Sequence, residues 1–143
     1  MRIVVDTNRI IAGLIKEGTA RKIITSDEIT FYTRGYVIEE INKYKDYIIE
    51  KSEMGEVFID LLVSLFMESV VIVSDKEIIV KMPEAKRIIG MIDEKDAPII
   101  ACALAISNEG IWTEDKHFEK QDRIKIWKTG DLQDYLEKTE RMD

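Results

Sequence analysis

The sequence contains very few of the residues that cross-link secreted proteins or bind soft metals. Among 143 residues there is one cysteine, Cys102, and one histidine, His117. A single cysteine cannot form an internal disulfide, and one cysteine with one histidine is too few for a structural zinc site. We therefore expect any bound metal to be held by oxygen ligands.

Long apolar runs are missing as well. The longest, Ala97 to Ile106, has ten residues and is too short to cross a bilayer. At the start of the sequence, Met1 to Val5 runs directly into Asp6, without the apolar segment of a signal peptide. These features predict a soluble, cytoplasmic protein that does not act at a membrane.

Basic residues are not in excess. The 21 Lys and Arg against 28 Asp and Glu give a net charge of −7, which argues against the broad basic surface of many nucleic-acid-binding proteins. The acidity belongs to the second part of the chain, because residues 1–51 carry nine basic and eight acidic side chains. The best candidates for contacting a nucleic-acid backbone lie in that first part, although scattered basic residues are usually only solvated: Arg9, Arg21, Lys22 and Arg34.

The chain reads as a single domain, 1–143, with alternating strands and helices. Hydrophobic residues make up 45% of it, which is enough for a core. Short β-branched runs predict strands at 1–5, 29–32, 70–73, 111–113 and 124–127. Apolar spacing predicts helices at 10–18, 20–25, 34–50, 53–67, 75–90 with an interruption at Pro83, 97–106 and 131–138. This alternation predicts a three-layer α/β/α sandwich around a mostly parallel sheet.

Two acidic residues directly follow predicted strands. Asp6 comes after the first strand and Asp115 after the strand at 111–113. Ligands of open parallel sheets collect at the carboxyl ends of the strands, so both are candidate site residues. Asp6 could equally cap the following helix, and Asp115 could be a turn residue.

Two further carboxylates are placed by helical geometry. On the predicted helix 34–50, Glu40 lies on the flank of the apolar face, whereas Glu39 points nearly opposite, toward solvent. Asp96 opens the apolar helix, where the helix dipole favours a negative charge. Asp93 could cap the same helix in place of Asp96. Capping accounts for only one of the two aspartates, so the other has no structural explanation.

Together, four carboxylates would meet at one end of the sheet: Asp6, Glu40, Asp96 and Asp115. Their mutual repulsion favours a bound cation, and oxygen ligands suit Mg²⁺ or Mn²⁺. Of the remaining reactive side chains, we expect His117 to be exposed and idle and Cys102 to be a buried hydrophobic residue.

Four short motifs carry a resemblance to a known family. They are Val4-Val5-Asp6-Thr7-Asn8, Glu40-Ile41, Asp93 through Ala101, and Trp112-Thr113-Glu114-Asp115-Lys116-His117-Phe118. In order and spacing these resemble the four signatures of the PIN-domain family, over residues 1 to about 130. Residues 131–143 would form a C-terminal helix and tail.

The resemblance implies a Mg²⁺- or Mn²⁺-dependent nuclease with a parallel α/β/α sandwich. Many family members are ribonuclease toxins paired with an antitoxin protein. Carried over to this sequence, the resemblance assigns the acidic metal and catalytic site to Asp6, Glu40, Asp96 and Asp115. It gives supporting roles to Asn8, Thr113 and Asp93, while Arg9 stands where the family usually has an aliphatic residue.

Two rival interpretations remain at this point. A phosphotransfer protein also places Asp after its first strand, but it needs a second acid beside Asp6, and Thr7-Asn8 supplies none. The second rival interpretation is a PIN-like module that binds nucleic acid or protein without catalysis. The resemblance also makes a homodimer an expectation, although no apolar stripe in the sequence demands one.

Overall fold

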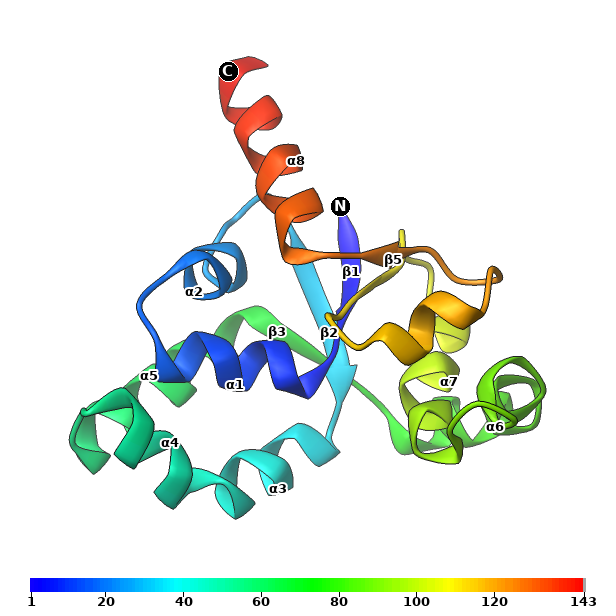
Figure 1. The fold of residues 1–143 in the computed structure, drawn as a ribbon, viewed down its shortest axis with the longest axis horizontal. Coiled ribbons are helices and arrows are strands. Elements are labelled where there is room, and N and C mark those ends of the chain that lie inside the picture. Colours follow the sequence, from blue (N-terminus) through cyan, green and yellow to red (C-terminus); the bar gives the residue numbers. More distant parts are fainter. Residues whose placement is uncertain (143) are drawn as a thin grey trace.

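The computed structural model describes residues 1–142, and one sheet of five parallel strands lies at its centre (Figure 1). The strands are β1 Arg2–Val5, β2 Thr30–Arg34, β3 Val70–Val73, β4 Ile111–Trp112 and β5 Ile126–Trp127. Their spatial order is β3-β2-β1-β4-β5, and every neighbouring pair is parallel. The chain builds outward from β1 in one direction and then in the other, so β1 lies at a switch point of the topology.

Helices cover both faces of this sheet, as expected for an α/β/α sandwich. The helices are α1 Thr7–Ile15, α2 Thr19–Ile24, α3 Tyr36–Lys43, α4 Lys45–Ser52, α5 Glu56–Ser69, α6 Asp75–Ile89, α7 Ala97–Ala105 and α8 Thr129–Met142. Two short 3₁₀ helices, η1 Glu94–Asp96 and η2 Lys116–Lys120, flank α7 and β4. In Figure 1, α6 and α7 lie on one side of the sheet, and α1 to α5 lie on the other.

The buried apolar residues form two cores, one on each face of the sheet, because successive side chains of β1 point to opposite faces. Ile3 and Val5 pack with α1, α2, α4, α5 and α8, whereas Val4 packs with α6 and α7. Successive side chains of a strand point to opposite faces, so a run of apolar residues suits a strand covered on both sides. Cys102 lies in the second core and is fully buried, as predicted. Burial raises the pKa of its thiol to about 12, so it is a packing residue and not a nucleophile.

The predicted helix at 34–50 is two helices. α3 and α4 meet at Tyr44, which is 41% exposed, whereas the sequence pattern placed it on the buried face. A straight helix over 34–50 would extend about 25 Å along one line. The bend at Tyr44 instead brings Ile48 into the core beside Ile10 and Leu14.

Pro83 does not interrupt its helix, contrary to the sequence prediction. α6 runs without a break from Asp75 to Ile89, with its N-terminus capped by the Ser74 hydroxyl. Proline removes one backbone hydrogen bond from a helix interior. Because Pro83 lies on the exposed side of α6, water can take the place of the missing donor there.

The outer face of α5 carries an exposed apolar stripe, which the sequence analysis did not recognise. Val57, Leu61 and Leu65 follow one another at intervals of four, and they are 75%, 65% and 51% exposed. Phe58 lies beside them and is 48% exposed. Residues four apart share one face of a helix, so these side chains form one continuous surface. Over residues 1–142, none of the helices combines the length and apolar character needed to cross a bilayer.

Candidate metal centre

The candidate site lies at the carboxyl ends of β1 and β4. Asp6 follows β1, and Thr113 and Asp115 follow β4. The two strands are neighbours, with Val5 paired to Trp112, so the residues after them emerge at the same edge. This edge is next to the switch point, where ligands of open α/β sheets bind.

Thr113 connects the two aspartates. Its hydroxyl donates to Asp6 Oδ2 at 2.9 Å and accepts from the Asp115 backbone N–H at 3.1 Å. Thr113 is fully buried, so the fold fixes both contacts. Asp6 Oδ1 accepts from the Asn8 backbone N–H at 3.4 Å as the N-cap of α1. Asp6 therefore serves both as a helix cap and as a member of the acidic group, whereas the Asn8 side chain is exposed and contributes only its backbone.

Burial and the charge of a neighbouring carboxylate both raise the pKa values of Asp6 and Glu40. The pKa of Asp6 is raised mainly by burial and further by the charge of Asp115, against the hydrogen bonds from Thr113 and Asn8. The pKa of Glu40 is raised by burial and then by the charge of Asp6. Glu40 is half-buried and Glu39 is exposed, as the helical phase predicted.

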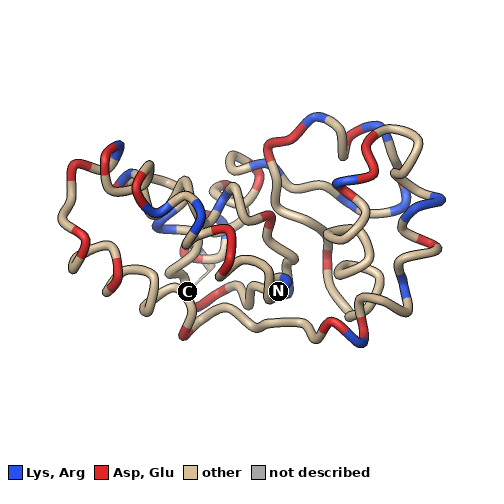
Figure 2. The backbone as a smooth tube through the Cα atoms, turned by 90° about the horizontal axis from the view of Figure 1, so that it is seen from below, with Lys and Arg blue, Asp and Glu red and all other residues tan. Residues whose placement is uncertain are grey.

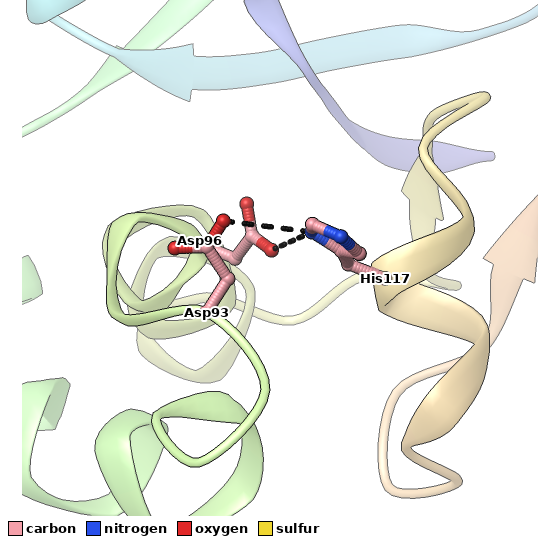
Figure 3. A group of neighbouring side chains, drawn as sticks. All are labelled: Asp93, Asp96 and His117. Atoms are coloured by element: carbon pink, nitrogen blue, oxygen red, sulfur yellow. Dashed lines mark hydrogen bonds and ion pairs between the residues drawn. The ribbon is translucent and has the colours of Figure 1, made fainter.

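A second part of the site lies between η1 and η2 (Figure 3). His117 Nδ1 is 3.3 Å from Asp96 Oδ2 and 3.5 Å from Asp93 Oδ2, and it is 3.7 Å from Asp115 Oδ1. His117 is thus partly exposed but not idle, because its ring faces three carboxylates. Sequence reasoning missed this contact, although His117 stands two residues after Asp115 and is the one histidine of the chain.

Asp93, and not Asp96, has the capping role. Asp93 Oδ1 accepts from the Lys95 backbone N–H at 2.9 Å as the N-cap of η1. Asp96 precedes α7 but makes no capping hydrogen bond with its side chain. Its pKa is raised by burial and by the charges of Asp115 and Asp93, while His117 lowers it. Helix capping therefore does not explain the position of the Asp96 carboxylate, which faces His117.

The carboxylates form a continuous series of repulsive neighbours, namely Glu40, Asp6, Asp115, Asp96 and Asp93. Such a series is stabilised by a cation. Within residues 1–142, the tight group of possible ligand atoms consists of Asp93, Asp96 and His117, all within 4.8 Å of one another. The residues therefore fit a divalent ion, and an imidazole nitrogen lies within reach of the same ion as two carboxylates, in addition to the oxygen ligands that the sequence predicts.

The sequence profile of the PIN domain matches residues 4–137. The chain belongs to the PIN-domain family. Members of this family are generally metal-dependent nucleases, so the family implies a nucleic-acid substrate and a divalent ion. The match extends beyond residue 130 and includes the first part of α8. No curated protein and no solved structure matches the chain.

Two of the four basic candidates lie beside the acidic group of this PIN domain. Arg9 is in the first turn of α1, where its charge lowers the pKa of Asp6, and its buried Nε has no hydrogen-bond partner. Arg34 ends β2, and its charge lowers the pKa of Glu40. Its guanidinium also lies over the ring of Tyr36, 5.3 Å from the centroid.

The other two basic candidates lie away from the acidic group. Arg21 donates to the carbonyls of Gly13 and Leu14 at 2.8 and 3.2 Å, so it completes the far end of α1. Lys22 lines a pocket between α2 and α8. Figure 2 shows basic and acidic residues interspersed along the described chain, in place of one continuous basic stretch.

Proposed function

We propose that this PIN domain is an endoribonuclease that hydrolyses RNA phosphodiester bonds with a carboxylate-bound Mg²⁺ or Mn²⁺. The observation that carries the proposal is the series of mutually repelling carboxylates at the ends of β1 and β4. Natural proteins tolerate such repulsion where function requires it. RNA as the substrate comes from the resemblance to ribonuclease members of the family.

In this proposal Asp6, Glu40, Asp96 and Asp115 hold the ion. A bound divalent ion supplies a water of lowered pKa and neutralises charge that develops on the phosphate oxygens. Thr113 keeps Asp6 and Asp115 at a fixed separation through its two hydrogen bonds. Arg9 and Arg34, whose charges act on Asp6 and Glu40, would attract the phosphate backbone, whereas Arg21 and Lys22 would act only on a long RNA.

The test is cleavage of single-stranded RNA by the purified protein. We expect cleavage with Mg²⁺ or Mn²⁺ and none in excess chelator, because no other source of an activated water is evident among the described residues. Asp6→Asn serves as the inactive control. Undiminished cleavage in chelator would contradict the proposal, and so would cleavage by the control variant.

We also propose a protein partner, either a second copy of the chain or an antitoxin, and a cytoplasmic role as the toxin of such a pair. The exposed stripe of Val57, Leu61 and Leu65 on α5 supports the partner, because apolar side chains gathered on one helix face are suited to burial in an interface. Light scattering on the purified protein, with Leu61→Glu as the comparison, tests it. A monomer in both samples excludes the second copy.

A further inference from the structure

The part of the site between η1 and η2 has a ligand set unlike the rest. Asp93 and Asp96 offer carboxylate oxygens, and His117 offers the imidazole Nδ1 (Figure 3). Carboxylates suit Mg²⁺ and Mn²⁺, whereas imidazole favours later first-row ions such as Co²⁺, Ni²⁺ and Zn²⁺. We propose that Asp93, Asp96 and His117 form an open site that selects Zn²⁺ or Co²⁺ over Mg²⁺. This inference rests on the proposed function in one respect only, which is that the two sites share Asp96.

The spacing of the ligand atoms supports a tetrahedral ion. His117 Nδ1 lies 3.3 Å from Asp96 Oδ2 and 3.5 Å from Asp93 Oδ2. Two ligands of a tetrahedral zinc ion, each about 2.0–2.1 Å from the metal, are about 3.4 Å apart. Adjacent ligands of octahedral Mg²⁺, at bonds of about 2.0–2.1 Å, are only about 2.9 Å apart. The two N···O separations are therefore closer to the tetrahedral than to the octahedral value, and the carboxylate oxygens of Asp93 and Asp96 lie within 4.8 Å of each other.

The three side chains are also oriented by contacts outside the ligand set. Asp93 uses Oδ1 to accept from the Lys95 backbone, which leaves Oδ2 facing the histidine. Asp115 Oδ1 accepts from the backbone N–H of His117 at 2.9 Å and so fixes the start of η2. Phe118, the next residue, is buried in the core and anchors the same segment. Contacts of this kind hold metal ligands in position before the ion arrives.

Three protein ligands leave one position of a tetrahedral ion open. Structural zinc sites have four protein ligands, whereas sites that bind water or substrate have three. Asp96 belongs to this trio and also to the repelling series that contains Asp115 and Asp6. An ion held here would therefore lie next to the proposed RNA site and not in a separate part of the molecule.

The competing explanation is that His117 is simply a counter-ion for the acids. In that case Nδ1 carries a proton and donates to Asp96, and no metal–nitrogen bond forms. The two explanations differ in a measurable way, because His117 is the one histidine in the sequence. Any histidine signal in a protein without a polyhistidine tag reports on this site alone.

The first experiment is a two-bond ¹H–¹⁵N spectrum of the untagged protein at roughly pH 8, where an ordinary histidine is neutral. We expect one equivalent of Zn²⁺ to shift the Nδ1 resonance to the position of a metal-bound nitrogen. Mg²⁺ in about hundredfold excess should neither produce nor reverse that shift. An Nδ1 resonance that Zn²⁺ leaves unchanged overturns the proposal.

The second experiment is calorimetric titration of variants whose folding is checked by circular dichroism. His117→Asn should weaken Zn²⁺ binding by more than about tenfold and change Mg²⁺ binding by less than about twofold. Asp134→Asn, an exposed carboxylate on α8, is the matched control and should leave both unchanged. Equal losses for the two metals in His117→Asn contradict the selectivity.

Neither measurement contains RNA, so the two proposals can fail separately. A zinc-dependent Nδ1 shift without any RNA cleavage removes the proposed function and leaves this inference standing. Metal-dependent RNA cleavage with an unchanged Nδ1 resonance removes this inference and leaves the proposed function standing.

Discussion

The two parts of the acidic site are built differently. On the β1–β4 side, Asp6 is held by Thr113, a neutral and fully buried donor at the end of a strand. On the η1–η2 side, Asp93 and Asp96 face the half-exposed His117, and all three come from 3₁₀ segments and the turn before them. On the strand side, Thr113 fixes the position of Asp6, whose carboxylate is desolvated, whereas on the second side an imidazole lies beside the carboxylates. We infer that Asp6, Glu40 and Asp115, together with the shared Asp96, are needed for cleavage, and that Asp93 and His117 mainly set the choice of ion.

The largest effect is expected for Asp6→Asn. The single oxygen of asparagine can still accept from the Asn8 backbone N–H, and its amide NH2 can donate to the Thr113 hydroxyl oxygen in place of accepting from it, so the main loss is the charge. RNA cleavage should fall by about a thousandfold or more, while the melting temperature of the metal-free protein stays the same or rises. Asp93→Asn should reduce cleavage much less. If Asp93→Asn is as damaging as Asp6→Asn in a cleavage assay, the division between the two sides is wrong.

The second prediction separates neighbouring glutamates on α3. Glu40 is half-buried beside Asp6, and Glu39 is exposed. Glu40→Gln should reduce cleavage by about a hundredfold, whereas Glu39→Gln should be nearly silent. Initial rates on the same RNA measure both. The reverse ranking would mean that the exposed face of α3, and not its flank, approaches the substrate.

The third prediction compares two buried threonines. Thr113 donates to Asp6, and Thr33 at the end of β2 donates to the Val5 carbonyl at 2.9 Å. Replacing either by valine removes a hydrogen bond made by a buried side chain and should cost about 1–3 kcal/mol in urea unfolding. Thr113→Val alone should also weaken Mn²⁺ binding, because it releases Asp6 and Asp115. Equal Mn²⁺ affinities for the two variants would show that Thr113 is only a packing residue.

The smallest effect is a pH dependence of the metal-free protein. The folded pKa of Asp6 is raised by burial, so its carboxyl stabilises the fold fully below the unfolded pKa of about 3.9. That contribution is lost as the pH rises through the raised pKa. The stability of the parent relative to Asp6→Asn should therefore decline from acidic pH toward neutrality. Chemical unfolding at several pH values, without metal, measures the difference, and a constant difference would contradict the raised pKa.

Much of the fold follows from local sequence. The alternation of short β-branched runs with helical spacing is a property of neighbouring residues, and it predicted all five strands within a few positions. The two wrong predictions, a single helix over 34–50 and an interruption at Pro83, concern positions whose structure depends on contacts with distant parts of the chain or with water. The bend at Tyr44 serves the packing of Ile48 against α1, and the tolerance of Pro83 depends on which side of α6 faces water. Neither condition is visible in a local window.

The candidate site was predictable to a similar degree. Asp6 and Asp115 follow strands, and Glu40 has a definite helical phase, so these positions came from simple geometry. The environment of His117 could not be predicted in this way, because it depends on the path of η2 after its N-cap residue Asp115. The spacing of Asp115 and His117 was a usable signal, since an aspartate that caps a short helix places the residue two positions later beside its carboxylate.

The order of the strands has a consequence for synthesis on the ribosome. β1 is made first yet lies in the middle of the sheet, and its partner β4 is made more than a hundred residues later. At about 5–20 residues per second, one edge of β1 waits for several seconds without its neighbour. A nascent chain thus holds Asp6 without Thr113 or Asp115, and we expect it to be inert as a nuclease until translation is nearly finished. RNA cleavage by stalled chains that end before Ile111 would refute this expectation.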